Sequence, residues 1–325
     1  MTISPNTFVV SAEQNDLTLA ALLRPCLPGQ SWSQVRRLIE TRHVRIGGDL
    51  CLDPARRVHA GETVELLDRP AAKPRQPEQI VIRHLDPHVV VVEKPSGISS
   101  VRHPTERVWT KQRKELSPTL EDLVPRRIAR EAQPRLRVVQ RLDKETSGLI
   151  VFARSHEAER VLGQQFRRHT VMRRYLALVP GDVRPQRIAT SLVRDRGDGR
   201  RGSDPSHPSP DSGGGQGGGV GKKAITHIDV VEQLPGYTLL GCRLETGRTH
   251  QIRIHLAELG HPICGDKVYV HRRDGTLFSD LSGAPRLALH AAELGFTHPV
   301  TGKEMHWTMP LPSDLEALLD RLRDV

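Results

Sequence analysis

Apolar residues gather in short runs along this chain, and many of the runs have the alternating or continuous pattern that predicts β-strands. Residues 149–153 are the clearest case, because five apolar residues in a row are typical of a buried strand. Asp86-Pro87 is a turn pair, so the first two strands of this region should form a hairpin. The predicted strands cover residues 81–84, 89–93, 136–139, 149–153, 171–179, 225–231, 238–245, 296–299 and 304–309.

Helical spacing replaces this pattern in three segments of the same region. Ser155 can cap a helix that extends to about residue 168, and Thr249 can cap a helix that ends at Gly260. A third predicted helix covers residues 311–322. Residues 104–135 are charged and rich in proline, so we expect loops there with one or two helices.

The first 70 residues predict a small separate unit. Residues 17–23 have helical spacing and should form a helix that ends before Pro25, because proline lacks the amide hydrogen that a helix interior needs. A second helix should begin at Ser31, since Gln34 can complete a capping box with it. The strands predicted in this unit cover residues 44–46 and 50–52, joined by the hairpin signal Gly47-Gly48, and residues 63–66.

Two segments predict no packed structure. Residues 71–79 are rich in Pro, Lys and Arg and predict a linker between the small unit, 1–70, and a large domain, 80–325. Residues from about 196 to 221 combine a Ser/Pro run with many glycines and cannot bury enough apolar surface to become ordered. We therefore expect a disordered insertion between two strands. Its glycines do not form a phosphate-binding loop, because the Lys-Ser/Thr pair and the helix that should follow are missing.

The chain is strongly basic. Its 325 residues include 48 Lys and Arg against 38 Asp and Glu, which gives a formal net charge of +10. This excess and the pI near 9.9 favour a polyanionic partner. Aromatic residues make up only 3% of the chain, which argues against binding single strands through a row of stacked rings.

The four cysteines are too scattered to predict a zinc site or a disulfide framework, and they suit a reducing compartment. They are Cys26, Cys51, Cys242 and Cys264. The sequence also shows no signal peptide and no apolar span of membrane length. We therefore expect a cytoplasmic protein without a membrane partner.

One octet, residues 141–148 (Arg-Leu-Asp-Lys-Glu-Thr-Ser-Gly), carries candidate chemistry. It places Asp143 beside Arg141 in a polar loop between two apolar runs, and Thr-Ser-Gly suits a turn. In a strongly basic protein, a carboxylate held there could be a nucleophile that acts on a polyanionic substrate. From these residues alone, an Asp–Arg pair that only holds the loop is an equal alternative.

The octet resembles the central motif of the RluA-type pseudouridine synthases, and four more segments resemble other motifs of that family in the family's order. These segments are Lys94-Pro95-Ser96-Gly97, Arg174-Tyr175-Leu176-Ala177, residues 247–256 continuing to Gly265-Asp266, and residues 286–291. The resemblance covers about residues 80–315, and five motifs in order are hard to reach by chance. One departure is Gln140, where the family often has His, so the local hydrogen bonding must differ there.

The resemblance implies an α+β fold, with a mixed or antiparallel sheet and flanking helices, and an RNA pseudouridine synthase activity. Such an enzyme flips a uridine out of the RNA, breaks its bond from N1 to the ribose, and rejoins the base through C5. It implies Asp143 as the nucleophile, Arg253 as its paired cation, and Tyr175 as a ring that stacks on the uracil. No cofactor and no metal are implied, because nothing is oxidised and no phosphate is transferred.

Four further residues of the large domain are expected to contact RNA. Arg141 would enter the space that the base leaves or hold its phosphate, Arg248 would contact a phosphate, and His250 would lie near the RNA. His250 and His255 are five residues apart, which does not match the i, i+4 spacing of zinc ligands on a helix. Lys94 would contribute to a pocket wall, and the alternative is a surface lysine before a turn.

The small unit resembles the S4 RNA-binding domain in its order of two helices and a hairpin. In that family the second helix and the following loop carry the basic surface, which here implies Arg36, Arg37 and Arg42 as RNA contacts. The alternative is a solvated helix face, because exposed charge runs often have no other role.

The favoured prediction is a monomeric enzyme that acts on ribosomal RNA. Family branches with the extra N-terminal module tend to modify the large-subunit RNA, so this is the expected target. A transfer-RNA-specific synthase and a non-catalytic RNA-binding or ribosome assembly factor stay open as alternatives. The trio Asp143, Tyr175 and Arg253 argues against the last, because a protein that only binds RNA does not need it.

Overall fold

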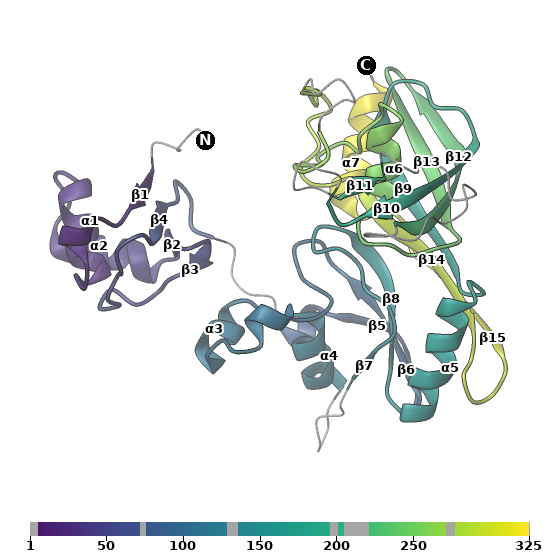
Figure 1. Ribbon diagram of the computed structural model, residues 1–325, viewed down its shortest axis with the longest axis horizontal. Helices are drawn as coiled ribbons and strands as arrows, with labels where there is room; N and C mark the ends of the chain where they lie inside the picture. The colour runs from purple at the N-terminus through teal and green to yellow at the C-terminus, as the bar shows by residue number, and fades with distance from the viewer. Residues whose placement is uncertain are drawn as a thin grey trace. The chain divides into compact units, whose positions relative to one another are not determined.

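The structure is a computed structural model in which residues 6–71, 76–128, 136–195, 201–204, 221–270 and 277–324 are described (Figure 1). The chain forms two compact units, one with residues 1–75 and 110–117, the other with residues 76–109 and 118–325. The predicted domains differ from these units in two places. The prediction assigns residues 110–117 to the large domain, and the units divide the predicted linker, residues 71–79, between them after residue 75. Among the described residues, no helix has the length and apolar character that crossing a membrane requires.

The small unit packs two helices on a four-stranded antiparallel sheet. Leu19 and Leu23 on the first helix and Val35 and Ile39 on the second are fully buried in one cluster with Val64 of the sheet. The four-residue spacing within each pair puts its side chains on one helix face. The elements of this unit are α1 (Leu19–Cys26), α2 (Trp32–Glu40), the short helix α3 (Lys111–Leu116), and the strands β1 (Thr7–Val9), β4 (Thr63–Leu66), β2 (Val44–Ile46) and β3 (Asp49–Leu50) in sheet order.

The start of α2 and the hairpin after it are confirmed. Gln34 N donates to Ser31 Oγ at 3.2 Å, and Ser31 N donates to Gln34 Oε1 at 2.6 Å, which is the predicted capping box. Gly47 and Gly48 join β2 to β3 with φ angles of 57° and 83°. Both angles lie in the left-handed region that glycine adopts without steric cost.

One prediction for this unit is wrong, and one strand was not predicted. Helix α1 does not end before Pro25 but includes it in its last turn. Only one hydrogen bond is lost there, and the helix stops one residue later, where Leu27 N donates to Arg24 O at 3.4 Å. Strand β1 has no prediction at all, because its few residues next to the chain start show no alternation that could be distinguished from a loop.

The described strands of the larger unit form one eleven-stranded sheet. Its order is β11-β10-β12-β13-β9-β14-β8-β6-β5, with β15 on β14 and β7 on β8, and all of these pairs are antiparallel except β8 with β14. The bounds are β5 (Val81–Leu85), β6 (Val89–Lys94), β7 (Arg137–Val138), β8 (Ser147–Ala153), β9 (Met172–Pro180), β10 (Gln186–Val193), β11 (Gly202–Ser203), β12 (Lys222–Leu234), β13 (Tyr237–Leu244), β14 (Leu289–Thr297) and β15 (Glu304–Thr308).

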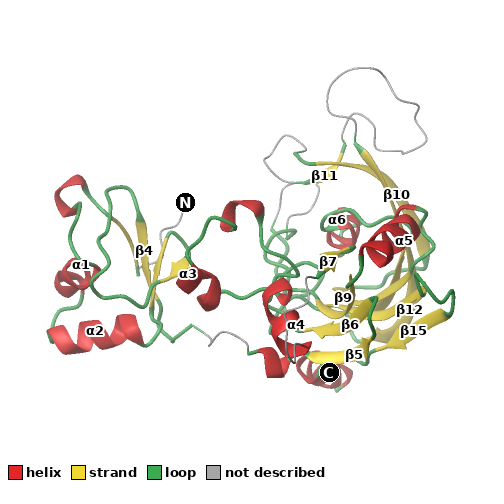
Figure 2. Cartoon of the chain, turned by 90° about the horizontal axis from the view of Figure 1, so that it is seen from below, coloured by secondary structure: helices red, strands yellow, loops and turns green. Residues whose placement is uncertain are grey.

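Helices cover both faces of this sheet. Val89 and Val91 of β6 pack in one cluster with residues of α5, while Val90 and Val92 pack in the other large cluster with residues of α4. The alternation follows from the two-residue period of a strand. Figure 2 shows α5 and α6 on one face and α4 and the C-terminal helix on the opposite face. The helices are α4 (Leu120–Ile128), α5 (His156–Arg167), α6 (Gln251–Glu258) and α7 (Ser313–Arg323), with 3₁₀ turns at Pro77–Gln79 and Pro104–Glu106.

The parallel pair β8–β14 needs glycine where the two strands approach. Ser147 lies opposite His290 and Gly148 opposite Ala291. A Cβ atom on Gly148 would lie 2.3 Å from the carbonyl oxygen of Ala291, and the φ angle of Gly148 is +122°. Any other residue would therefore force the strands apart directly after the polar loop of the octet.

Three sequence predictions for the larger unit need correction. Of the predicted linker, residues 72–75 lie outside the described residues, while residues 77–79 are a 3₁₀ turn rather than extended chain. Of the predicted disordered insertion, residues 196–200 and 205–220 lie outside the described residues, but Gly202–Ser203 form β11, paired with β10. Strand β10 itself was not predicted, because its polar side chains hide the alternation that its pairing with β12 reveals.

Candidate active site

Asp143 lies in the loop between β7 and β8, and fixed polar groups hold this loop on both sides of it. Ser100 Oγ donates to Leu142 O at 2.9 Å and accepts from Leu142 N at 3.0 Å. On the other side, Thr146 N donates to the carbonyl of Asp143 at 3.2 Å. The carboxylate of Asp143 is 25% exposed, so the loop presents it to solvent from a restricted position.

Lys94, predicted to contact RNA, instead holds this loop from inside. Its side chain is fully buried, and Nζ donates to the carbonyls of Pro95, Lys144 and Thr146 at 3.1, 2.9 and 2.6 Å. Three carbonyl oxygens replace the water that a buried ammonium group loses. Both expectations for Lys94 are therefore wrong, since it neither reaches an RNA nor lies on the surface. It fixes the backbone on the C-terminal side of Asp143.

Arg253 connects Asp143 to a second, deeper carboxylate. Its Nη1 lies 3.5 Å from Asp143 Oδ2, so the predicted ion pair between these two residues is present. The shorter contacts go to Asp266, whose Oδ2 and Oδ1 accept from Nε and Nη2 at 2.7 and 2.8 Å. A bidentate pair of this kind fixes the plane of the guanidinium group and leaves its Nη1 edge toward Asp143.

The Arg253–Asp266 pair is buried and ionised. Burial alone lowers the pKa of Arg253, but the hydrogen bonds and charge of Asp266, with the charge of Asp143, outweigh it and raise that pKa. Burial raises the pKa of Asp266, and the hydrogen bonds and charge of Arg253 outweigh it, so the net shift is downward. The amides of Val268 and Tyr269 donate to Asp266 Oδ1 at 2.8 and 3.1 Å and hold the carboxylate in place.

His250 forms the end of the site next to Asp143. Its Nε2 lies 3.9 Å from Asp143 Oδ2, and its Nδ1 lies 2.8 Å from the hydroxyl of Tyr269. Burial lowers the pKa of His250, although the charge of Asp143 opposes this shift. The ring of Tyr269 also lies 5.1 Å from the guanidinium carbon of Arg253, as a cation–π pair does.

The prediction that Thr249 caps α6 is wrong, because the capping position is occupied by His250. This residue has a left-handed φ of 59° and makes no side-chain cap. The side chain of Gln251 accepts the hydrogen bonds of this turn instead. Its Oε1 accepts from Arg248 N at 3.0 Å and from Thr246 Oγ1 at 2.7 Å. The left-handed turn aims the His250 ring at Asp143.

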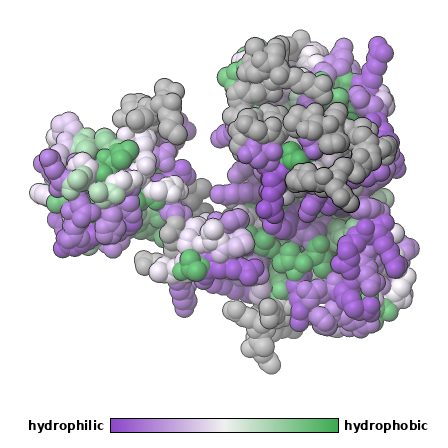
Figure 3. Space-filling view, in the orientation of Figure 1, coloured by the Kyte–Doolittle hydropathy of each residue, from purple (hydrophilic) through white to green (hydrophobic). Residues whose placement is uncertain are grey.

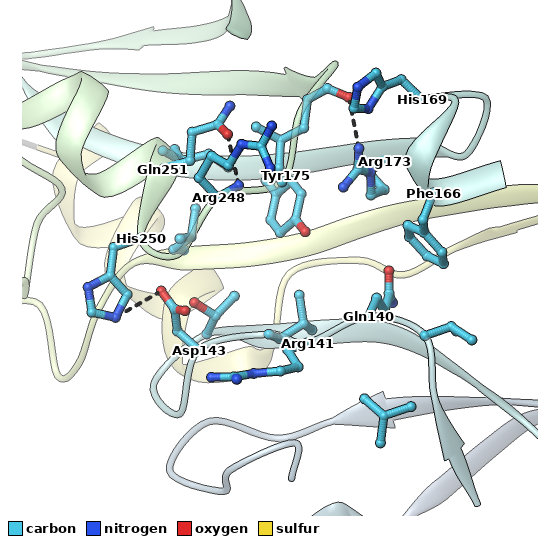
Figure 4. A pocket seen from close by; sticks show the side chains of 18 of the residues that line it. Gln140, Arg141, Asp143, Phe166, His169, Arg173, Tyr175, Arg248, His250 and Gln251 are labelled. Carbon is cyan, nitrogen blue, oxygen red and sulfur yellow. Dashed lines mark hydrogen bonds and ion pairs between the residues drawn. The ribbon is translucent and has the colours of Figure 1, made fainter. Parts of the chain in front are cut away.

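Tyr175 reaches the site from β9. Leu176 and Leu178 of this strand pack against α7, so Tyr175 points to the opposite face, where α6 lies. Burial raises the pKa of the Tyr175 hydroxyl, the charge of Arg173 opposes the shift, and that of Asp143 adds to it. Figure 4 shows the ring across the pocket from Asp143.

Arg173 lies on the same face of β9, two residues before Tyr175. Its Nη2 donates to the carbonyls of Leu244 and Glu245 at 3.4 and 3.2 Å, and its guanidinium carbon lies 5.6 Å from the ring of Phe166. Its buried Nε has no hydrogen-bond partner within the described residues. Gly247 leaves room for the group, since a Cβ there would lie 2.7 Å from Arg173 Nη1. Burial lowers the pKa of Arg173, with Tyr175 acting in the other direction.

These side chains surround one cavity of about 630 Å³, large enough for a nucleoside. Arg141 is exposed on the same wall as Asp143, Arg248 lies on the opposite wall, and Gln140 lines the cavity near Phe166 (Figure 4). Arg248 is anchored by its Nε, which donates to Lys223 O at 2.9 Å. The structure thus brings together Asp143, Tyr175, Arg253, Arg141, Arg248 and His250, and of the residues predicted in the large domain only Lys94 is absent from the cavity.

The three arginines predicted in the small unit differ in their surroundings. Arg36 and Arg37 are exposed on α2, and Figure 3 shows a largely hydrophilic surface over the part of the small unit where α1 and α2 lie. Arg42 is half-buried, and its Nε donates to Ala71 O at 2.8 Å. Burial lowers the pKa of Arg42. Arg42 therefore helps to close the end of this unit, and Arg36 with Arg37 form its accessible basic pair.

Three residues of the site were not predicted from the sequence: Asp266, Tyr269 and Arg173. The two-residue period of the strand could have identified Arg173, because it must share a face with Tyr175. Asp266 stands in a segment that resembles the family pattern, but nothing local indicates that it binds Arg253. Tyr269 has no sequence signal of its own.

Comparisons with known proteins agree with this geometry. Residues 88–258 match the family described as RNA pseudouridylate synthase, and residues 26–64 match the S4 domain. The ribosomal large subunit pseudouridine synthase D of Nitrosomonas europaea is 34% identical over 98% of this chain and 89% of its own length. The protein of the same name from Neisseria meningitidis serogroup A is 35% identical over 94% of this chain and 78% of its own length.

Solved structures share the fold of the larger unit. Human RNA pseudouridylate synthase domain containing 4 superimposes with a TM-score of 0.58 at 23% identity, over 75% of this chain and 93% of that one. Human RNA pseudouridylate synthase domain containing 1 gives 0.55, also at 23% identity, over 76% and 90%. The predicted α+β fold class and both predicted resemblances are thereby confirmed. The chain belongs to the RNA pseudouridylate synthase family of isomerases and carries an S4 domain in its N-terminal unit.

Proposed function

We propose that this enzyme converts uridine to pseudouridine in large-subunit ribosomal RNA, with Asp143 as the nucleophile. The relatives most similar over nearly the whole chain carry the name of that target, and the S4 domain supports a structured RNA substrate. The observation that carries the catalytic part is the placement of Asp143. Its carboxylate lies in the wall of a nucleoside-sized cavity, 3.5 Å from Arg253 and facing Tyr175.

The reaction breaks the bond between uracil N1 and ribose C1′ and forms a bond between C5 and C1′. The proton on C5 is lost and N1 gains one, so atoms and charge balance without an oxidant or a second substrate. The enzyme must therefore hold the detached base, turn it and manage one proton. An ionised carboxylate is required for attack, and the guanidinium group of Arg253, fixed by Asp266, lies 3.5 Å from the carboxylate of Asp143.

Each further residue has a role that follows from its position. The ring of Tyr175 would stack on the extruded uracil, and its hydroxyl, held protonated by burial, would serve in the proton transfer. Arg141 is exposed beside Asp143 and would fill the space that the base leaves in the RNA or hold its phosphate. Asp266 and Lys94 would act as positioning residues, one through Arg253 and the other through the loop backbone.

The nucleophile is tested with Asp143→Asn, which keeps the shape of the side chain and removes its charge. We expect this variant to bind the RNA and to lose at least about a thousandfold in single-turnover rate, as removal of a nucleophile does. Glu145→Gln is the matched control, because Glu145 lies in the same loop but outside the cavity. Its rate should stay within about twofold of the original. Product formation by Asp143→Asn at a near-normal rate would overturn the assignment.

The target is tested by mapping pseudouridines at nucleotide resolution in cells with and without the protein. Loss of sites from large-subunit ribosomal RNA, restored by the intact protein but not by Asp143→Asn, supports the proposal. Loss from transfer RNA instead would favour the alternative substrate. An unchanged map in every RNA would favour a binding or assembly factor.

The proposal includes a monomer that works in the cytoplasm. Its support is indirect. The four cysteines are free thiols, three of them buried, as expected in a reducing compartment. Asp143, Tyr175 and Arg253 line one cavity within this chain, which is compatible with a monomer.

A further inference from the structure

A second hollow, of about 450 Å³, adjoins the Asp143 cavity on the far side of Arg248. The two share Gly247 and Arg248, which lie in both linings. The second hollow lies where the end of β10, the segment before β11 and the start of β12 meet the turn that precedes α6. Its lining consists of Leu192, Val193, Arg194, Arg201, Lys222, Gly247, Arg248, Thr249 and Ile254. We call it the basic pocket.

Among the described residues, the charges that line it are all of one sign. They are Arg194, Arg201, Lys222 and Arg248, with no carboxylate among the described lining residues. Across the described residues, no Asp or Glu lies within ion-pair distance of any of these four cations. Four cations around one hollow repel one another, and a bound anion would remove that cost.

Other arginines of this unit are neutralised by the protein. Arg174 lies 2.9 and 3.1 Å from Asp229 and Glu293, and Arg286 lies 2.6 Å from Asp314. The absence of such partners in the basic pocket is therefore not a general property of the surface. Within the part of the chain that the structure describes, these cations are left without a counter-charge, which a bound anion would supply.

The pocket is built from fixed parts. Ser203 of β11 donates through N and Oγ to the two carboxylate oxygens of Glu258, at 2.8 and 2.5 Å, and this joins β11 to the end of α6. Arg201 directly precedes β11 and is held with it. Arg248 is anchored through its Nε to Lys223 O. Leu192 and Ile254 of the lining are buried in one apolar cluster with Ala224, Ala257 and Tyr269.

The charge of this pocket also acts on the catalytic wall. Burial is the main reason for the lowered pKa of His250, and the positive charge of Arg201 is a further contribution in the same direction. Arg201 also lowers the pKa of Tyr269 against the larger effect of burial. Because the two hollows share Gly247 and Arg248, one RNA segment can contact both.

We propose that the basic pocket binds the phosphodiester backbone of the RNA strand next to the nucleotide that enters the Asp143 cavity. Arg248, between the two hollows, would contact the phosphate at the boundary, and Arg194, Arg201 and Lys222 would contact the phosphates beyond it. The described lining residues include no aromatic ring and few groups that could read a base edge, so the contact would be independent of sequence. The inference rests on the proposed function in that it takes RNA as the substrate.

The test removes three of the cations and leaves Arg248, which also lines the catalytic cavity. The variant Arg194→Gln/Arg201→Gln/Lys222→Gln is compared with Arg160→Gln/Arg184→Gln/Lys303→Gln, which has the same change in charge at exposed residues of this unit outside both hollows. Binding is measured over a range of salt concentrations, with a transcribed large-subunit ribosomal RNA and with polyuridylate.

For the pocket variant we expect affinity to fall by about ten- to a hundredfold at low salt, and the slope of log affinity against log salt to fall by about two to three. The loss should be of similar size with both RNAs, because the contact does not read sequence. The control variant should lose less than about threefold, with a slope change below about one.

Equal affinities and slopes for the pocket and control variants would overturn the inference. If the pocket variant does not fold, as judged by its circular dichroism, Arg194→Gln/Lys222→Gln is used, because both residues are exposed. A failure of the proposed function is a separate result, since the intact protein would then make no pseudouridine in ribosomal RNA. In either case, the difference in RNA binding between the pocket variant and the control variant tests whether the basic pocket binds RNA.

Discussion

Arg253 is the residue through which the buried part of the site acts on the exposed part. Its two shortest contacts go inward to Asp266, whose side chain is fully buried, and its contact with Asp143 is longer, at 3.5 Å. A guanidinium held by Asp143 alone would be free to swing in a pocket of this size. The inner carboxylate fixes it, so that the charge next to the nucleophile is in place before RNA binds.

The first prediction concerns this inner carboxylate. Asp266→Asn leaves Arg253 buried without its counter-charge, so we expect the free energy of unfolding to fall by about 3 kcal/mol. In the fraction that stays folded, kcat should fall about 10- to 100-fold with little change in KM, because the guanidinium is misplaced while RNA contacts remain. Urea unfolding and steady-state kinetics measure the two effects.

Asp314→Asn is the control for this experiment, since it breaks a bidentate pair with Arg286 outside the cavity. Asp314 is 43% exposed, so the loss should be about 1 kcal/mol or less, with kcat unchanged. Asp266→Glu keeps the charge and should restore part of kcat. A normal kcat for fully folded Asp266→Asn would show that Asp266 has only a structural role.

At the residue scale, the sequence predicts the site residues that stand in family motifs. It misses residues whose roles depend on contacts with distant parts of the chain. Asp143, Tyr175 and Arg253 stand in motif positions, and the structure brings them into one cavity. Asp266 could not be assigned, because its pairing with Arg253 depends on how the segment after α6 folds back. Lys94 was misassigned for a related reason. A lysine before Pro-Ser-Gly has the local pattern of an exposed turn, and the carbonyls that bury it come from a loop about fifty residues later.

At the element scale, the site depends on how α6 is fixed to the sheet. His255, on this helix, has Nδ1 2.9 Å from Thr226 Oγ1 of β12 and Nε2 3.0 Å from Thr190 Oγ1 of β10. Burial lowers the pKa of His255 to about 4. The neutral ring, with one donor and one acceptor nitrogen, satisfies both hydroxyl groups. The same helix carries Arg253. Protonation of His255 would therefore weaken the attachment of α6 to the sheet and disturb the position of Arg253.

The second prediction is the resulting pH dependence. In the unfolded chain His255 has a pKa near 6.5, so between about pH 6.5 and pH 4 the unfolded state binds more protons than the folded state. Stability is therefore complete above pH 6.5 and is lost as pH falls. From pH 7 to pH 5 this residue alone should lower the free energy of unfolding by about 2 kcal/mol.

Urea unfolding of His255→Gln at pH 7 and pH 5 measures this contribution. Glutamine keeps a donor and an acceptor but does not titrate, so the variant should lose about 2 kcal/mol less than the original protein over this range. His156→Gln is the control, because that side chain is 82% exposed, and it should follow the original protein. An equal pH dependence in all three proteins would contradict a buried neutral His255.

Element boundaries follow the strength of the local pattern. Strand β8 is buried at every residue, and its continuous apolar run predicts it well. Strand β10 has the sequence Gln-Arg-Ile-Ala-Thr-Ser-Leu-Val, in which too few apolar residues alternate to predict a strand. It forms because β12, which is thirteen residues long, offers a pairing partner. The prediction for the turn before α6 is wrong for another reason. A left-handed non-glycine residue such as His250 is rare, and the more usual capping residue Thr249 stands next to it.

At the scale of the whole molecule, the proposed chemistry belongs to the larger unit, and both units carry exposed basic side chains. The larger unit holds the cavity and the basic pocket, and the S4 domain adds the exposed pair Arg36 and Arg37 on α2. Neither arginine has a carboxylate partner among the described residues, although Arg36 Nε lies 3.4 Å from Trp32 O. The distribution of charge along the sequence predicted both the polyanionic partner and this surface. It could not predict the basic pocket, because that pocket gathers residues from four separate segments.

The third prediction of this Discussion tests the S4 surface. Arg36→Glu/Arg37→Glu should weaken binding to large-subunit ribosomal RNA about tenfold or more and lower the salt slope by about two, because two phosphate contacts are lost. Arg57→Glu/Arg69→Glu makes the same change in charge in the same unit and should have a much smaller effect, since long-range attraction is screened at about 0.1 M salt. Single-turnover rates at saturating RNA should be unchanged in both variants, because neither pair lines the cavity. Equal salt slopes for the two variants would mean that α2 is only a solvated helix face, and that the S4 domain binds RNA through another surface or not at all.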